Sequence, residues 1–285
     1  MRIPSSDGVV VVVHELSPTP SPQQPPLLLS HATGFHGRVW EPVAGLLADR
    51  FGSVALDYRG HGDTIAPPEW AVDWSGYGDD VTAVARAVWR PGGLIGVGHS
   101  MGGAGLLMAA LRQADLFRAI VVYEPIVIPP EGMRPASTEN PLAAGARRRR
   151  ATFDSFEAAI SNYAAKPPLN AFTPAALDAY VRGGFRAEDD GSVHLKCTPE
   201  HEARTFEASA NPELWDRLGE ITVPVWVVSG RPHAGEPSMM APGIAERLPN
   251  AQYVEEDDLD HFGPMTHPER IADLVRAVAD RTGAD

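Results

Sequence analysis

Cysteine is nearly absent from the sequence, as are long apolar runs and an excess of basic residues. The single cysteine, Cys197, cannot form a disulfide within the chain, and the first residues lack the basic start and apolar stretch of a secretory signal, so we expect a cytoplasmic protein. No run approaches the roughly 20 apolar residues of a membrane span, so none is expected. Lys and Arg number 24 against 37 Asp and Glu, and the net charge of −13 argues against nucleic acid as a partner.

Short runs of Val, Ile and Leu recur along the chain and alternate with segments that have helical spacing of apolar residues. The runs are continuous rather than alternating, which is typical of strands covered on both faces. This order predicts an α/β fold with a doubly wound, mostly parallel sheet. The expected strands are 9–13, 26–31, 53–58, 94–99, 119–124, 223–229 and 251–256, and the expected helices are 39–50, 77–90, 101–113 and 267–281.

One segment interrupts this alternation. Between about residues 129 and 211 the sequence has several prolines, helical patterns near 153–164 and 174–182, and no convincing buried strand. We therefore expect a helical cap at 129–211, inserted into a core that is made of 1–128 and 212–285.

Two groups of side chains in this insertion have alternative interpretations. Four arginines fill 147–150; a charge run beside a helix is usually a solvated face, and an anion-binding surface is the alternative. Several aromatic residues are expected in the core of the insertion, with substrate contact as the alternative. These are Tyr163, Phe172, Tyr180 and Phe185.

The segment from Gly98 to Gly102 carries the pattern G-x-S-x-G between an expected buried strand and an expected helix. The pattern requires this context, because Ser100 must sit on a tight turn that flanking side chains would crowd. Its Oγ would then project from the carboxyl end of the strand. The N–H of Met101 at the start of the helix would face developing negative charge, and a histidine is needed nearby to accept the proton of the hydroxyl.

These features resemble the α/β-hydrolase superfamily, and in particular a serine hydrolase with a helical cap inserted after the sixth strand. The resemblance covers most of the chain. Residues 27–40 resemble the loop that supplies the second oxyanion donor; this implies the backbone N–H of Thr33, with Ala32 in place of the usual glycine. Residues 54–64 resemble a turn with a mainly architectural role in the superfamily.

The same resemblance implies roles for several further residues. Within the turn at 54–64, Asp57 and His61 are expected to be structural. The histidine that follows the last strand is His261, which becomes the expected general base; His267 is the alternative, at a helix start where a capping or surface role is more common. Aromatic residues flank this expected centre and are predicted to line the pocket: Phe35, Trp40 and Phe262.

A catalytic triad of this superfamily consists of the nucleophile, the histidine and an acid that hydrogen-bonds to the histidine. The position of the acid is where this sequence departs from the common pattern. Many relatives place an aspartate shortly after the strand at 223–229, where this chain has Pro232 or His233; Glu236 lies a few residues further on. Some relatives, certain haloalkane dehalogenases among them, carry the acid one strand earlier, where Glu124 stands. An unpaired buried glutamate is costly, so we expect His261 as its partner. A structural role for Glu124, and Glu236 as the acid, are the alternatives.

Serine at the nucleophile turn favours acyl chemistry over the alkyl-ester chemistry of dehalogenases and epoxide hydrolases. We expect a serine hydrolase that cleaves a small-molecule ester or related acyl bond through an acyl-enzyme on Ser100. No cofactor is required, and no metal-ligand spacing is evident among the histidines. A carbon–carbon bond hydrolase, a perhydrolase and a non-catalytic binding protein of the same fold are the alternatives.

Overall fold

An eight-stranded sheet with the order β1-β2-β4-β3-β5-β6-β10-β11 forms the centre of the molecule. The structure is a computed structural model that describes residues 1–19, 24–132, 140–209 and 212–283. At one edge β1 pairs antiparallel with β2, and β2 pairs antiparallel with β4; the other neighbouring strands pair in parallel, which gives the mostly parallel sheet that was predicted. The bounds are β1 Arg2–Pro4, β2 Val10–Ser17, β3 Leu27–Ser30, β4 Ser53–Asp57, β5 Leu94–His99, β6 Phe117–Tyr123, β10 Val225–Ser229 and β11 Ala251–Glu255.

Each apolar run that predicts a strand overlaps one and extends at most two residues beyond it. The central strands are almost entirely buried because helices cover both faces of the sheet, so their sequences are continuously apolar. β6 begins at Phe117 and ends at Tyr123, which leaves Glu124 just beyond the strand. The edge strand β1 was not predicted, since its three residues have no apolar run and lie near the surface.

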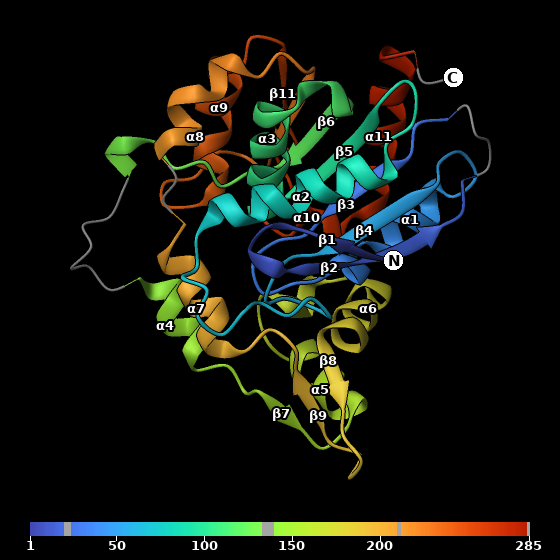
Figure 1. Ribbon diagram of the computed structural model, residues 1–285. Coiled ribbons are helices and arrows are strands. Elements are labelled where there is room, and N and C mark those ends of the chain that lie inside the picture. The colour runs from blue at the N-terminus through green and yellow to red at the C-terminus, as the bar shows by residue number, and fades with distance from the viewer. Residues whose placement is uncertain (20–23, 133–139, 210–211, 284–285) are drawn as a thin grey trace.

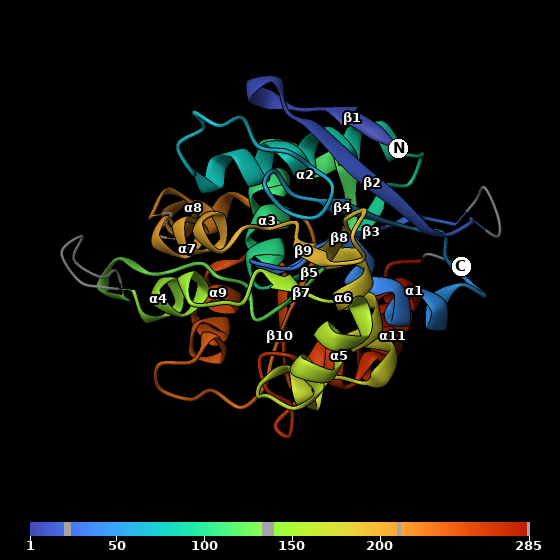
Figure 2. The same ribbon diagram turned by 90° about the horizontal axis from the view of Figure 1, so that it is seen from below.

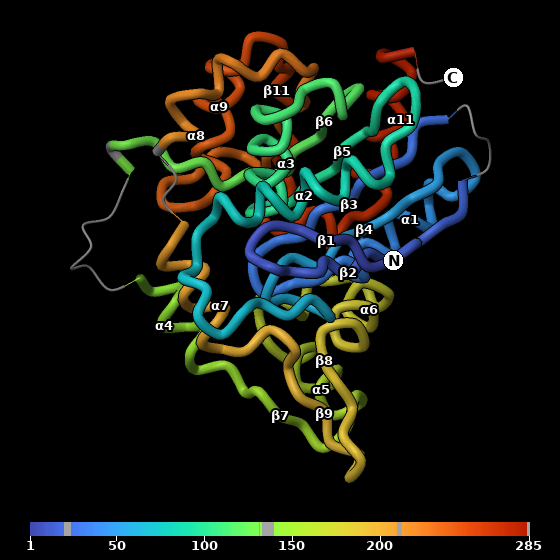
Figure 3. The backbone as a smooth tube through the Cα atoms, viewed as in Figure 1, coloured from blue at the N-terminus to red at the C-terminus, as the bar shows by residue number. Residues whose placement is uncertain are grey.

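Two layers of helices pack on the sheet, one on each face (Figures 1 and 3). One apolar cluster joins the sheet to α1 and α11, and it extends into the insertion; a second cluster joins the opposite face to α2, α3, α8 and α9. The doubly wound architecture follows from this burial of both faces. The bounds are α1 Glu41–Leu47, α2 Trp74–Val88, α3 Met101–Arg112, α8 Pro212–Arg217, α9 Ala241–Arg247 and α11 Pro268–Arg281.

The chain leaves the sheet after β6 and returns at β10, and much of the segment between them lies below the sheet in Figure 1. In Figure 2, α4 and α7 lie side by side, as do α5 and α6. The insertion also contains a three-stranded sheet, β7-β9-β8, so a purely helical insertion was wrong in this detail; strands of two or three residues leave no readable pattern. The bounds are α4 Pro141–Arg147, β7 Thr152–Phe153, α5 Phe156–Ala164, α6 Pro174–Gly184, β8 Phe185–Ala187, β9 Val193–Leu195 and α7 Pro199–Glu207.

Hydrogen bonds fasten the insertion to the loops that follow the parallel strands. His36 Nε2 donates to the carbonyl oxygen of Tyr180 at 2.9 Å, and Trp74 Nε1 donates to that of Thr205 at 3.0 Å. The insertion thus covers the carboxyl ends of the strands, where ligands of open α/β sheets bind. The division into a core and a cap domain at the predicted boundaries stays a prediction.

Among the described residues, no helix combines the length and the apolar composition that crossing a membrane requires. Cys197 is free and buried. The cytoplasmic location expected from the sequence stays a prediction.

Candidate active site

Ser100 occupies the turn between β5 and α3. Its backbone has φ 57° and ψ −119°, and the residue is only 6 % exposed. Its N–H donates to the carbonyl oxygen of Tyr123 at 3.0 Å, which ties the turn to the end of β6. Backbone strain of this kind persists only where the surrounding structure enforces it, and it is concentrated at functional sites.

Two glycines allow α3 to start against the neighbouring strands. A Cβ atom on Gly102 would lie 2.2 Å from the carbonyl oxygen of Ser30, and one on Gly98 would lie 2.7 Å from the carbonyl oxygen of Gly102. A side chain at Gly102 would push the helix away from β3, one at Gly98 would push it away from β5, and either would shift Ser100. This close approach is the physical reason for both glycines of the G-x-S-x-G pattern.

Glu124 follows β6 directly and also has a left-handed backbone, with φ 43°. The residue is 1 % exposed, and each carboxylate oxygen has a donor: Oε1 accepts the N–H of Gly230 at 3.0 Å, and Oε2 lies 2.7 Å from Nδ1 of His261. These bonds compensate for the loss of water around a buried charge. The predicted pairing with His261 is present, and the catalytic role of the pair stays a prediction.

Two buried side chains hold the loop that carries His261. His99 Nε2 lies 2.7 Å from the carbonyl oxygen of His261, and the hydroxyl of Tyr123 donates to the carbonyl oxygen of Asp260 at 2.7 Å. Burial lowers the pKa of His99 well below its usual value, so its ring is neutral and the proton lies on Nε2, which donates to the carbonyl. The strand ends that carry Ser100 and Glu124 thereby also position the histidine loop.

The ring of His261 lies beside the nucleophile turn. Its ring centroid lies 4.7 Å from that of His99, the neighbour of Ser100 in the sequence. Glu124 occupies Nδ1, which leaves Nε2 as the ring nitrogen available to a substrate or to Ser100. Within the described part of the chain, Ser100 Oγ and His261 make no hydrogen bond to each other; such contacts are often long in ligand-free enzymes.

The two expected oxyanion donors lie together beside Ser100. Thr33 Oγ1 donates to the sulfur of Met101 at 3.4 Å, and both residues are buried. Neither backbone N–H has a hydrogen-bond acceptor among the described residues. His31 fixes the loop before Thr33: its Nδ1 donates to the carbonyl oxygen of Ala32 at 2.7 Å, and its Nε2 accepts the N–H of Tyr58 at 3.1 Å.

Four aromatic rings surround the histidines of the site. Phe35 stacks on Phe262 with a centroid separation of 6.3 Å, and it meets Tyr180 edge-on at 5.0 Å. Phe172 contacts the other three rings, and Phe262 also touches the ring of His261. Trp40 is fully buried in the same core and, in the part of the chain that the structure describes, makes no ring contact with this group. The pocket role of Phe35, Trp40 and Phe262 stays a prediction.

A buried ion pair of the insertion lies against the oxyanion loop. Arg149 Nη1 donates to Glu202 Oε2, and Arg149 Nη2 donates to the hydroxyl of Tyr180 at 2.6 Å. A Cβ on Gly34, next to Thr33, would lie 2.4 Å from Glu202 and 3.3 Å from Arg149 Nη1. The solvated face predicted for the arginine run is thus wrong for Arg149, because its partner lies far away in the sequence, on α7.

The alternative site residues lie elsewhere. Glu236 is exposed at the start of a short 3-10 helix, and within the described chain it makes no contact with His261. His267 precedes α11 and bonds through Nδ1 to the hydroxyl of Thr266 at 2.9 Å. Neither residue joins Glu124, His99 or Ser100.

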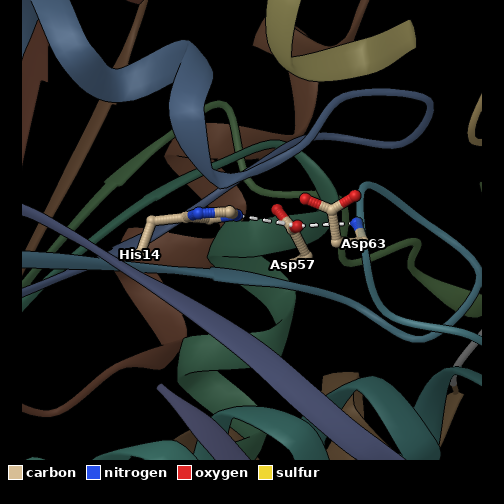
Figure 4. A group of neighbouring side chains, drawn as sticks. All are labelled: His14, Asp57 and Asp63. Carbon is tan, nitrogen blue, oxygen red and sulfur yellow. Dashed lines mark hydrogen bonds and ion pairs between the residues drawn. The ribbon is translucent and has the colours of Figure 1, made fainter. Parts of the chain in front are cut away.

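His14, Asp57 and Asp63 form a group with one potential metal-ligand atom each within 4.8 Å of one another (Figure 4). The oxygens of Asp57 already accept the N–H groups of Gly37 at 2.7 Å and of Asp63 at 2.8 Å, and one of them lies 2.8 Å from His14 Nε2. The ammonium of Lys196 lies 2.7 Å from Asp63. A cation would have to displace Lys196, so we assign a structural role to this group.

Sequence reasoning missed two residues that complete the site. The N–H of Gly230 holds Glu124, and the hydroxyl of Tyr123 holds the loop of His261. The signals were present: Gly230 follows β10 directly, and Tyr123 directly precedes the expected acid. Neither could be assigned without knowing that β6 and β10 are neighbours.

The Alpha/beta hydrolase family matches residues 27–274, and the chain belongs to this family. 2-(Acetamidomethylene)succinate hydrolase from Mesorhizobium japonicum is 36 % identical over 100 residues, which make up 35 % of each chain, so the match spans about a third of that relative. Pimeloyl-[acyl-carrier protein] methyl ester esterase from Aromatoleum aromaticum is 26 % identical over 262 residues, 90 % of this chain and 98 % of that one.

Solved structures show the same fold. The crystal structure of E-2-(acetamidomethylene)succinate hydrolase has a TM-score of 0.74 at 22 % identity and covers 98 % of this chain and 99 % of its own. The predicted fold class is confirmed, and the protein is an enzyme of the hydrolase class.

We predict that Gly102→Ala lowers the free energy of unfolding by about 1–3 kcal/mol, because the new Cβ overlaps the carbonyl oxygen of Ser30. Chemical denaturation measures this change. The matched control is Gly45→Ala in α1, where a Cβ meets no atom within 4 Å and the stability should stay the same or rise by up to about 1 kcal/mol. Equal effects of the two substitutions would contradict the argument.

We predict that Asp57→Asn destabilises the fold by about 1–3 kcal/mol near neutral pH, because an amide cannot accept every N–H that the carboxylate accepts. Burial raises the pKa of Asp57, but the hydrogen bond and charge of His14 and the N–H of Asp63 outweigh it and hold the pKa below its usual value. The charged form therefore stabilises the folded state above the unfolded pKa of about 3.9, and this contribution is lost as the pH falls through the folded pKa.

Urea denaturation of both proteins at several pH values tests this prediction. The difference between wild type and Asp57→Asn should shrink below about pH 4. Asp63→Asn is the control, since Asp63 is half exposed and its pair with Lys196 is expected to contribute about 1 kcal/mol or less. If the difference in unfolding free energy between wild type and Asp57→Asn grew toward acidic pH, the predicted direction of the pH dependence would be wrong.

Proposed function

We propose that the protein is a serine hydrolase that cleaves an ester or related acyl bond of a small molecule. Ser100 is the nucleophile, His261 the general base and Glu124 the acid that orients it. The observation that carries the proposal is the 2.7 Å contact between Glu124 and His261, at a strand end next to the strained turn of Ser100. No metal or organic cofactor takes part in the steps below.

In the first half of the reaction, Ser100 Oγ attacks the acyl carbon while His261 Nε2 accepts the hydroxyl proton. Glu124 accepts the hydrogen bond from Nδ1–H, which fixes the tautomer that leaves Nε2 free and stabilises the imidazolium that forms. The N–H groups of Thr33 and Met101 hold the negative oxygen. The bond to the leaving group then breaks, and His261 returns the proton to the departing oxygen or nitrogen.

In the second half, the acyl group is an ester of Ser100. Water attacks the acyl carbon and gives its proton to His261, and the acid product leaves when Ser100 Oγ takes that proton back. Phe262, which packs on His261 and stacks on Phe35, covers one side of the imidazole with apolar surface.

The names of the relatives support acyl rather than carbon–carbon bond cleavage. One matched relative is a methyl ester esterase and another hydrolyses an acetamido compound. The Glu124–His261 pair also supports a catalytic protein over a non-catalytic binding protein, since a carboxylate that orients an imidazole beside a nucleophile turn is the arrangement of a general base.

We expect Ser100→Ala to lower turnover of short p-nitrophenyl esters at least about 1,000-fold, because no other group replaces the nucleophile. Release of p-nitrophenol measures the rate, and a fluorophosphonate probe should label the wild type at Ser100 only. Ser161→Ala, with an exposed serine on α5, is the control and should keep both properties. A folded wild-type protein that is neither labelled nor active would refute the proposal.

We expect Glu124→Gln to lower kcat by about 100- to 10,000-fold with little change in KM, because the imidazolium loses its charged partner. Glu236→Gln is the matched control and should stay within about twofold of the wild type, since Glu236 is exposed. Steady-state kinetics give both constants, and circular dichroism checks the fold of each variant. If Glu236→Gln were the more damaging change, the assignment of the acid would be wrong.

A further inference from the structure

A cavity of about 280 Å³ lies in the insertion between the residues that follow α4 and the last turn of α5. Its charged lining is entirely basic, although the whole chain carries a net charge of −13. The side chains that line it include Arg148, Arg149, Arg150, Asn162, Tyr163 and Lys166.

These basic groups are only partly neutralised. Lys166 Nζ donates to the neutral amide oxygen of Asn162 at 2.7 Å, and Arg148 has no ion-pair partner among the described residues. Arg150 lies 3.8 Å from Asp154, whose side chain is 95 % exposed, so water screens this pair. The neighbouring Arg147, by contrast, bonds to both Glu200 and Glu207. The cavity therefore gathers cations that repel one another unless an anion joins them.

Helix-end stabilisation does not account for this arrangement by itself. Basic residues favour the carboxyl ends of helices, and both α4 and α5 end near the cavity. That effect requires no common hollow, and Arg147, which closes α4, already provides it. Here Arg148, Arg150 and Lys166 line one hollow together with an amide and a phenol.

We propose that this cavity binds a carboxylate group that the acyl substrate carries away from the bond to be cleaved. Guanidinium groups present paired N–H donors that match a carboxylate, and an ammonium adds a point charge. The volume of about 280 Å³ lies at the lower end of small-molecule sites, which suits a short aliphatic acid rather than a long acyl chain. The inference rests on the proposed function and names the substrate class for it.

Arg149 connects the cavity to the active site. It lines the cavity and, on its other side, it lies against Gly34 in the oxyanion loop and bonds to Tyr180, whose ring packs on Phe35. Glu202 pairs with its charge, while Arg148 and Lys166 have no ion-pair partner among the described residues. An acidic substrate seated in the cavity thus lies one side chain away from the oxyanion loop.

Binding is tested with full-length Ser100→Ala protein, so that the result does not depend on turnover. Isothermal titration at low salt is expected to show monomethyl adipate binding more tightly than inorganic phosphate, and no binding of neutral methyl hexanoate. The double variant Arg148→Gln/Lys166→Gln in the same background should weaken binding at least about tenfold. Arg186→Gln, an exposed arginine of β8 outside the cavity lining, is the matched control and should bind as before.

Turnover provides the second readout. In the otherwise wild-type enzyme, the double variant should lower the ratio of kcat/KM for mono-p-nitrophenyl adipate to that for p-nitrophenyl hexanoate about tenfold, and Arg186→Gln should preserve the ratio. Equal binding of phosphate and monomethyl adipate, or equal affinity of the double variant and its parent, would overturn the carboxylate assignment. An inactive wild type that still binds monomethyl adipate through these residues would refute the hydrolase proposal and leave the anion site standing.

Discussion

The hydrogen bond between the buried carboxylate of Glu124 and the ring of His261 is the constraint on which the rest of the site depends. A carboxylate that is 1 % exposed is stable only if donors replace the water it has lost. The donors come from two other parts of the chain, Gly230 after β10 and His261 after β11. The charge of one residue therefore fixes the relative positions of three loops at the carboxyl end of the sheet.

The backbone is strained at the ends of β5 and β6, next to this hydrogen bond. Ser100 and Glu124 both have left-handed backbones, and Tyr123 joins them, since its carbonyl oxygen accepts the N–H of Ser100. Such conformations cost about 1–3 kcal/mol each and survive only where packing and hydrogen bonds outweigh them. Here the tight approach of Gly102 to β3 and the two bonds of Glu124 provide that compensation. The strain thus lies at the ends of two neighbouring strands, on either side of the hydrogen bond between Ser100 and Tyr123.

The sequence predicted those parts of the fold whose signal is local. The central strands are buried on both faces, so each is a continuous apolar run, and the turn of Ser100 needs glycines within two residues. The partner of Glu124 was predicted because a buried acid needs a donor. Contacts between distant segments could not be predicted from the sequence. Gly230 meets Glu124 only because β10 pairs with β6. The position of Arg149 depends on its ion pair with Glu202, which lies on α7. The short strands of the insertion carry too few residues for any periodicity.

The insertion packs directly on the loop that carries Thr33. Gly34 has φ 76° and leaves no room for a side chain, because the Arg149–Glu202 pair occupies the space that its Cβ would fill. The same loop continues to His36, which bonds to the backbone of α6. A displacement of the insertion would therefore move the loop that presents the Thr33 N–H. Since oxyanion stabilisation depends on donors placed before the reaction begins, the packing of the insertion and the rate of the proposed chemistry are coupled through this loop.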